Sequence, residues 1–468
     1  MEKIKNVKGS YDYGSRDQII RNFISDTLKS VFNQYGYKPL STSILCYYEL
    51  LALKYKEDNE ILNEIYKVTD QAKRNLGLRY DLTVPFAKYI AINKNINLPY
   101  KRYEIGKVFR DGPVKKGRIR EFIQCDVDSV GIEGQLVEAE LISLFVEGFK
   151  RLGIDIIIKY NNRKIMVGII EICEVPKEKI NQVITIIDKF EKLTKEEIEL
   201  EFLNIGLKEK QIEKLINFLN MSFNEIKMEF QNTNNSLLKE GIKEVSELNE
   251  YIEAINLNKY VQFVGSLARG QEYYTGTVFE VYQINGKITQ SIGGGGRYDE
   301  MIGDFIGDGK KYPAVGISFG LDVIFDILKE KQNIKNTNTD VYIIPMGNNA
   351  KAMKIAQDLR KQNINVDIEM NNKRLKKVLN YANIENIPFV IILGEDELKE
   401  DKVIIKNMKI GLQLKVGIEE IPQKLKDLDI NYKILNPGGN KTAIIIGNQY
   451  NEKLKKEIND KILKENLD

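Results

Sequence analysis

The stretch YEIGKVFRDGPVKKGRIREFIQCDVD, residues 103–128, decides the fold. Apolar and polar residues alternate on both sides of a loop that contains glycine and lysine, which is typical of two antiparallel strands. One face of the second strand is apolar and suited to a core. The opposite face is mainly polar and carries Arg118, Arg120, Phe122, Gln124, Asp126 and Asp128. The stretch therefore predicts a sheet with one buried face and one face rich in arginine, amide and carboxylate groups.

Two features favour an anionic ligand on this polar face. The loop holds Lys115 and Lys116 beside Gly117, and Arg110 ends the first strand where it can reach across to the second. Arginine stays charged at any working pH, and its planar fork can bind phosphate or carboxylate at two points. A solvated sheet face would show the same alternation, so the pattern by itself leaves both interpretations open.

The chain contains no histidine among its 468 residues. This excludes Ser–His and Cys–His nucleophilic pairs and the zinc motifs that depend on imidazole. Chemistry here must rely on arginine, carboxylates, tyrosine and metal ions. The formal net charge of +3 is too small to indicate a nucleic-acid partner unless a local patch provides one.

The sequence also predicts a cytoplasmic chain without a membrane span. No run of eighteen apolar residues occurs, and the N-terminal residues do not form an apolar signal segment. The three cysteines, Cys46, Cys125 and Cys173, are far apart and form no CxxC pair. We interpret them as buried thiols in a reducing compartment.

Changes in residue pattern divide the chain. Residues 1–330 are expected to form a core domain, interrupted at about 161–258 by a Lys-, Glu- and Ile-rich insertion with helical spacing. Residues 331–339 are interpreted as a linker. Alternating apolar runs and helical stretches predict a small α/β domain at 340–424, and 425–468 form an extension of unknown role.

Two further regions carry related chemistry. The segment 78–89 reads LRYDLTVPFAKY, and the segment 267–280 reads LARGQEYYTGTVFE. A run of four glycines precedes Arg297 in the segment 291–299; such a run usually marks a turn or tight packing, but here it favours backbone close to a ligand. Neither a Walker phosphate loop nor a GxGxxG fingerprint after a strand occurs, so a bound nucleotide would be held by arginines on a sheet.

In this order and spacing, the segments resemble the catalytic domain of the histidyl-tRNA synthetase family, which are class II aminoacyl-tRNA synthetases. The matching parts are motif 2 at 110–122, a substrate-binding strand at 78–89, two histidine-specific signatures at 267–280 and 293–299, motif 3 at 313–321 and the anticodon-binding domain at 340–416. The resemblance implies an α+β fold, with an antiparallel-sheet catalytic domain, a helical insertion and a small α/β anticodon-binding domain.

The resemblance also implies the reaction and its partners. Histidine would be joined to ATP, and the histidyl group would then pass to the 3′ end of tRNA(His). Mg²⁺, a homodimer and a cytoplasmic location belong to the same expectation. Neither step needs a protein histidine, because the substrate's own carboxylate attacks and the enzyme aligns the reactants and neutralises charge.

Site residues follow from the resemblance alone. Arg110 and Arg269 would act at the reacting carboxylate and α-phosphate. The family's ATP-binding positions would be Arg110, Arg118, Arg120 and Gly320, and its histidine-binding positions would be Asp81, Leu82, Thr83, Arg110, Gln124, Asp128, Arg269, Tyr273, Tyr274 and Tyr298.

This chain departs from the family pattern at two places that concern adenine. Val323 stands where motif 3 usually ends in an arginine, and Gly112 stands where motif 2 commonly has an acidic residue. The alternative is therefore a non-catalytic paralogue that senses histidine or tRNA, like the regulatory subunit of ATP phosphoribosyltransferase. That subunit normally lacks an anticodon-binding domain, so the resemblance favours the enzyme.

Overall fold

The computed structural model describes residues 4–53, 60–93, 95–114, 117–190, 193–269, 273–330, 337–428, 431–435 and 442–446. Lys115 and Lys116 of the basic loop, most of the expected linker and most of the C-terminal extension lie outside these residues. The chain divides into two compact units: the first consists of Met1–Tyr13 and Ile20–Gln332, and the second of Gly14–Ile19 and Asn333–Asp468. None of the described helices combines the length and apolar character that a bilayer-spanning segment needs.

The first unit is built on an eight-stranded sheet with the order β1-β5-β6-β11-β10-β9-β7-β8. Only the outer pairs, β1 with β5 and β7 with β8, are parallel; the inner pairs are antiparallel, which confirms the expected class of fold. The strands are β1 Lys38–Pro39, β5 Tyr100–Phe109, β6 Glu121–Val130, β7 Ile156–Asn162, β8 Val261–Phe263, β9 Thr277–Gln283, β10 Gly293–Arg297 and β11 Ala314–Gly320.

The predicted hairpin is the pair β5–β6, which places Phe109 opposite Glu121 and Arg102 opposite Asp128. The apolar face of the sheet is covered by α1 (Ser15–Gln34) and α5 (Leu136–Arg151), and α13 (Leu321–Lys329) packs on β6 and β11. Phe319 of β11 lies at the centre of this layer, with the rings of Phe32, Phe145 and Phe149 within 6 Å of its own. This packing anchors one face of the sheet and leaves the other for polar groups.

A second, small sheet of the same unit is formed by strands from the N-terminal part of the sequence, in the order β2-β4-β3. Its strands are β2 Leu45–Tyr47, β3 Lys67–Thr69 and β4 Asn75–Leu78, and the accompanying helices are α2 Tyr48–Ala52, α3 Glu60–Glu64, α4 Thr83–Ile92 and α12 Met301–Ile306. Tyr80, Phe86 and Met301 are buried in its core.

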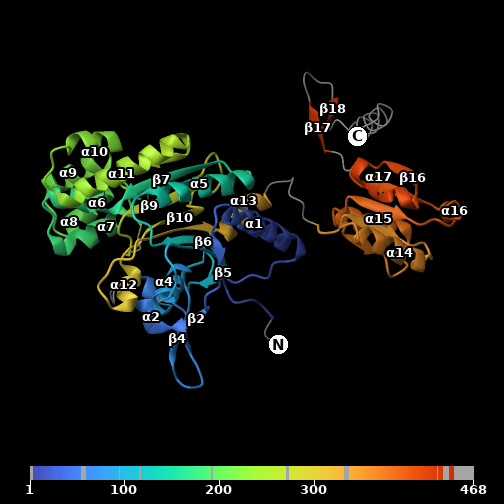
Figure 1. Cartoon of the computed structure of the whole chain (residues 1–468), viewed down its shortest axis with the longest axis horizontal. Coiled ribbons are helices and arrows are strands. Elements are labelled where there is room, and N and C mark those ends of the chain that lie inside the picture. The colour runs from blue at the N-terminus through green and yellow to red at the C-terminus, as the bar shows by residue number, and fades with distance from the viewer. Residues whose placement is uncertain are drawn as a thin grey trace. The chain divides into compact units, whose positions relative to one another are not determined.

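The expected insertion is helical. It leaves the sheet at the end of β7 and contains α6 Arg163–Ile172, η1 Lys177–Lys179, α7 Ile180–Ile187, α8 Lys195–Asn204, α9 Glu209–Leu219, α10 Phe223–Glu229, α11 Ser236–Ala254 and η2 Asn258–Tyr260. Thr194 and Ser222 begin α8 and α10 with capping boxes, as their spacing to Glu197 and Glu225 favours. Figure 1 shows these helices, in green, gathered at the β7 side of the large sheet.

The second unit holds a five-stranded sheet with the order β13-β12-β14-β15-β16. Its strands are β12 Val341–Ile344, β13 Val366–Ile368, β14 Phe389–Ile392, β15 Lys402–Asn407 and β16 Gln413–Gly417, and its helices are α14 Asn349–Arg360, α15 Leu375–Ile384, α16 Glu395–Lys399, η3 Ile418–Glu420 and α17 Ile421–Leu428. Leu425 and Leu428 of α17 are buried in the core, so this helix continues past residue 424. Two strands, β17 Asn431–Leu435 and β18 Thr442–Ile446, then pair antiparallel.

Candidate active site

A cavity of about 250 Å³ lies on the polar face of the large sheet. Strands β6, β9, β10 and β11 line it, and so do the segments before α4 and around Tyr273. Ten of the predicted site residues line this one cavity, although six different chain segments contribute them: Asp81, Thr83, Arg110, Gln124, Asp128, Arg269, Tyr273, Tyr274, Tyr298 and Gly320. The alternation in β6 placed Phe122, Gln124, Asp126 and Asp128 on the ligand face, and all four line the cavity.

The four-glycine run is a central strand, β10, and not a turn. Neighbouring atoms come too close to this strand for it to carry side chains. A Cβ at Gly294 would lie 1.9 Å from Nη1 of Arg269, and one at Gly295 would lie 2.0 Å from the carbonyl oxygen of Gly316. A Cβ at Gly296 would lie 2.7 Å from the ring of Tyr274. Glycine at these positions therefore makes room for the arginine and tyrosine that line the cavity.

Arg110 and Arg269 both line the cavity and are each held by a backbone carbonyl. Nε of Arg110 donates to the carbonyl oxygen of Tyr80 at 3.1 Å, and Nη1 of Arg269 donates to that of Phe279 at 2.8 Å. Glu280 lies 3.6 Å from Arg269 as its carboxylate partner. Neither arginine has to change its charge to meet an anion, and the carbonyl contacts restrict where each guanidinium lies.

Buried ionic groups form the acidic side of the cavity. Asp128 accepts a hydrogen bond from Tyr298 at 2.6 Å, and its other oxygen lies 2.7 Å from Nη2 of Arg102. Arg102 is fully buried, lies over the ring of Phe86 and donates to the carbonyl oxygen of Leu82 at 3.0 Å. Leu82 therefore does not line the cavity; its backbone helps to hold the cation behind Asp128.

Burial sets the protonation of these carboxyl groups. Burial raises the pKa of Asp81 to about 6. The backbone N–H of Val84 donates a hydrogen bond to Asp81 at 3.0 Å, and this bond opposes the shift. Burial raises the pKa of Asp126 to about 8, opposed by the charge of Arg102. It also raises the pKa of Asp128. Burial therefore favours the protonated form of these carboxyl groups more than in an exposed aspartate.

Buried polar atoms without a hydrogen bond concentrate here. Among the described residues, six buried side-chain atoms make no hydrogen bond, namely Oδ2 of Asp81, Nε and Nη1 of Arg102, Oε1 of Gln124, Oδ1 of Asp126 and Oδ2 of Asp128. Two of them still have an ion-pair partner: Oδ2 of Asp128 faces Nη2 of Arg102 at 2.7 Å, and Nη1 of Arg102 lies 3.8 Å from Glu104. Four of the six belong to residues that line the cavity, and Arg102 lies directly behind Asp128. Buried polar atoms are nearly always partnered in folded proteins, so this concentration marks a place built for a polar ligand.

Arg118 and Arg120 do not line the cavity. Strand β6 begins at Glu121, so the alternation that assigned them to its polar face does not extend to them. Arg118 forms an ion pair with Glu64, and Arg120 lies 3.0 Å from Asp111. A Cβ at Gly112 would lie 2.8 Å from the carboxylate of Glu64, so Glu64 supplies an acidic group where the family's motif often has its own.

The site residues that the resemblance implied did not include several polar residues of this cavity. Asp126, Glu280 and Ser318 line the cavity, and Arg102 supports it. Asp126 had a signal, since it alternates with Gln124 and Asp128. Arg102 could have been found from the hairpin register, which sets it opposite Asp128. Ser318, whose hydroxyl accepts from Gln124 at 3.1 Å, had none, because it depends on the pairing of β6 with β11.

Comparisons with known proteins agree with this geometry. The histidyl-tRNA synthetase family matches residues 12–324, and an anticodon binding domain family matches residues 340–428. A histidine–tRNA ligase of Bacillus cereus is 48% identical over 424 residues, covering 90% of this chain and 96% of that protein. The crystal structure of histidyl-tRNA synthetase from Nostoc superposes with a TM-score of 0.82 at 27% identity, covering 91% of this chain and all of that one.

These matches place the chain among the class II aminoacyl-tRNA synthetases. The length and identity of the matches define the family within that class. The chain belongs to the histidyl-tRNA synthetase family, and it is a histidine–tRNA ligase. A solved ATP phosphoribosyltransferase regulatory subunit/histidyl-tRNA synthetase from Bacillus halodurans is 20% identical with a TM-score of 0.71, which shows a shared fold and does not favour the regulatory alternative.

Proposed function

We propose that the cavity on the large sheet is where this ligase binds histidine and joins it to ATP. The observation that carries the proposal is the concentration around it of buried polar atoms that make no hydrogen bond. Histidine offers an imidazole, an ammonium group and a carboxylate. The cavity offers three buried aspartates, tyrosine hydroxyls and two arginines along a single lining.

In the first step, a carboxylate oxygen of histidine attacks the α-phosphorus of ATP. The new O–P bond forms as the bond from that phosphorus to the pyrophosphate oxygen breaks. Arg110 and Arg269 would neutralise the reacting carboxylate and phosphate, and no proton has to be removed. The main contribution of the site is alignment, which can be worth about 7–11 kcal/mol, together with fixed positive charge.

Selectivity for histidine would come from the acidic side of the cavity. Asp128 is held by Tyr298 and Arg102, so its carboxylate cannot turn away from an imidazole N–H. Asp81, Thr83, Gln124, Tyr273 and Tyr274 would complete the pocket. A buried site built to hydrogen-bond its substrate can reject analogues that lack the matching group by about 10⁴–10⁵.

The nucleotide region is the part next to Phe122 and Gly320. Mg²⁺ bound with ATP commonly uses one or two protein carboxylates and several phosphate oxygens. In the part of the chain that the structure describes, no group of three His, Cys, Asp or Glu side chains has an arrangement that could hold a metal ion. Glu280 lines the cavity and would be the carboxylate toward the ion, whose chemistry is to neutralise phosphate charge. Arg118 and Arg120 would reach ATP only after leaving their present carboxylate partners.

We extend the proposal to the second step, to assembly and to domain boundaries. The unit that begins near residue 340 would bind the anticodon of tRNA(His), with the exposed basic residues of 373–377 as part of that surface. A homodimer in the cytoplasm is the form that the family resemblance implies. The catalytic part would be 1–330 with its insertion at about 161–258, followed by a linker at 331–339.

Removal of Arg269 tests the proposed chemistry. Arg269→Ala should abolish histidine-dependent exchange of labelled pyrophosphate into ATP, while histidine binding remains measurable by calorimetry. Arg151→Ala is the control, because Arg151 lies on the surface of α5 and pairs there with Glu147. Undiminished exchange in Arg269→Ala would show that the arginine has been given the wrong role.

A further inference from the structure

Two consecutive asparagines, Asn161 and Asn162, are fully buried at the point where β7 ends and the insertion begins. They do not line the cavity. A buried amide needs partners for its two hydrogens and its oxygen, so such residues are retained where their hydrogen bonds fix neighbouring backbone. Each residue of this corner, residues 161–163, makes a hydrogen bond to the segment between Gly265 and Thr277.

Asn161 holds the residues that lead to Arg269. Its Nδ2 donates to the carbonyl oxygens of Gly265 at 2.9 Å and Leu267 at 3.1 Å, and its Oδ1 accepts from the backbone N–H of Asn162 at 2.8 Å. The side chain is thereby saturated. Leu267 stands two residues before Arg269, so the position of the arginine's backbone depends on this amide.

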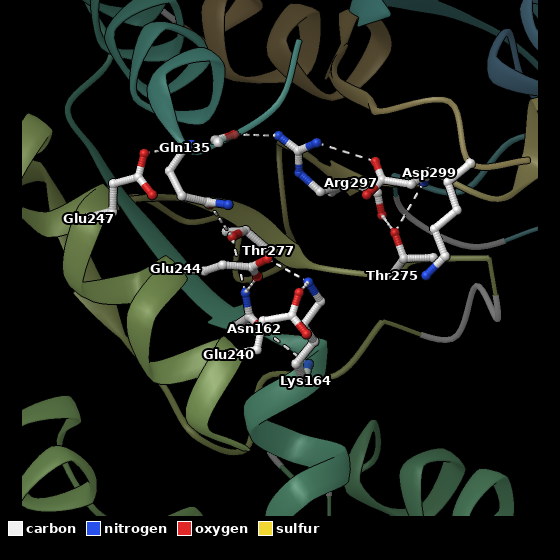
Figure 2. Close-up of polar contacts among 12 residues, drawn as sticks. Gln135, Asn162, Lys164, Glu240, Glu244, Glu247, Thr275, Thr277, Arg297 and Asp299 are labelled. Carbon is white, nitrogen blue, oxygen red and sulfur yellow. Dashed lines mark hydrogen bonds and ion pairs between the residues drawn. The ribbon is translucent and has the colours of Figure 1, made fainter. Parts of the chain in front are cut away.

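The other two residues of the corner hold the far end of the same segment. The backbone N–H of Arg163 donates to the carbonyl oxygen of Gly276 at 2.9 Å. Nδ2 of Asn162 donates to Glu244 of α11 at 2.8 Å and lies 3.4 Å from the hydroxyl of Thr277. Figure 2 shows Asn162 next to Glu244 and Thr277, with Gln135 on the far side of Thr277.

We propose that the corner 161–163 is the positioning element of the active site, and that Asn161 is the residue that places Arg269. The corner does not line the cavity. Its hydrogen bonds instead hold both ends of the segment that carries Arg269, Tyr273 and Tyr274. The placement must be tight, because Nη1 of Arg269 occupies the space over Gly294 where a Cβ would lie 1.9 Å away. The inference rests on the proposed role of Arg269.

Loss of the Asn161 amide should act on the rate and not on binding. Asn161→Ala frees the carbonyls of Gly265 and Leu267 and lets Arg269 shift, and a misplacement of about 1 Å can lower a rate about 100-fold. We expect kcat for adenylate formation to fall about 100-fold, with KM for histidine changed less than about threefold. Asn161→Asp, which keeps the size and the acceptor but loses the donor, should show the same fall.

A double-mutant cycle separates positioning from general weakening. Single-turnover adenylate formation is measured for Asn161→Ala, for Arg269→Ala and for the variant with both changes. The same comparison is made with Arg269→Lys in place of Arg269→Ala, because the lysine variant should keep a rate that can be measured. If Asn161 acts through Arg269, adding Asn161→Ala to either Arg269 variant lowers the rate less than about threefold. Thermal unfolding checks that each variant is folded.

Asn235→Ala is the matched control. Asn235 caps α11 and donates to Glu171 inside the insertion, so its loss weakens the same module without touching the segment before Arg269. It should keep the wild-type rate. Additive losses in the cycle, or a normal rate for both Asn161 variants, would overturn the inference. A normal rate for Arg269→Ala would instead refute the proposed role of Arg269.

Discussion

Gly294→Ala is the perturbation whose effect the structure defines most sharply. The added Cβ would lie 1.9 Å from Nη1 of Arg269 and 2.7 Å from the carbonyl oxygen of Phe279. The carbonyl belongs to the adjacent strand β9 and has little freedom to move. The guanidinium would have to withdraw by about 1.5 Å to reach an ordinary contact of 3.4 Å, and it would lose its hydrogen bond to Phe279.

Displacement of the guanidinium by this distance should stop alignment. The contact with the Phe279 carbonyl also forces β9 and β10 apart locally, so some loss of stability is expected beside the loss of rate. Since about 1 Å of misplacement can cost about 100-fold, we expect histidine-dependent pyrophosphate exchange to fall at least about 100-fold. The assay follows labelled pyrophosphate into ATP at saturating histidine, and circular dichroism checks the fold.

Gly14→Ala serves as the control for glycine replacement. Nothing lies within 4 Å of a Cβ at Gly14, so exchange should stay at the wild-type rate. If Gly294→Ala is folded and exchanges pyrophosphate as fast as Gly14→Ala, the position of Arg269 is not what limits activation. The reasoning from close approach would then be refuted.

Two further predictions concern buried charge. Because burial raises the pKa of Asp126 to about 8 from its ordinary value, its contribution to stability is complete below about pH 4 and is lost as the pH rises toward 8. The free energy of unfolding of the wild-type chain should therefore decrease as the pH rises through this range, by up to about 1.4 kcal/mol per pH unit from this group. In Asp126→Asn, measured by urea unfolding at several pH values, this decrease should be smaller. The same dependence on pH in both proteins would contradict the raised pKa of Asp126. Glu138→Gln breaks a buried ion pair with Arg297, in which two N–O distances are 2.6 and 2.8 Å, and should lower the free energy of unfolding by about 3–5 kcal/mol. Glu147→Gln breaks a partly exposed pair on the same helix and should lower it by less than about 1 kcal/mol. Equal losses for the two variants would contradict the burial argument.

The β5–β6 hairpin shows why part of the site could be predicted from sequence. A period of two in β6 assigns Gln124, Asp126 and Asp128 to one face without any knowledge of the neighbours. The same rule fails for Arg118 and Arg120, because the strand starts only at Glu121. A local pattern gives the face of a strand but not the residue at which its backbone leaves the sheet.

The residues that support the site were beyond local reasoning. Arg102 matters because the hairpin register sets it opposite Asp128, and Asn161 matters because β7 and β8 pair in parallel next to the segment that leads to Arg269. Each contact joins residues far apart in the chain. The glycine run illustrates the same limit, since only the pairing of β10 with β9 and β11 shows why side chains are excluded there.

The absence of histidine fits the chemistry of this site. In the proposed site, activation would rely on arginines and on the substrate's own carboxylate, and the imidazole in the pocket would be that of the substrate. A further hypothesis is that such a chain can be synthesised when charged tRNA(His) is scarce. Comparison of histidine usage across other proteins of the same organism would test it, because a general shortage would make a specific advantage unnecessary.

The most direct test of the central claim is exchange of labelled pyrophosphate into ATP by the purified wild-type chain, with histidine compared against each other amino acid. The account predicts exchange with histidine, and selectivity of about 10⁴ or more over amino acids that lack a ring N–H. A well-folded protein that shows no histidine-dependent exchange, or that exchanges equally with other amino acids, would contradict it.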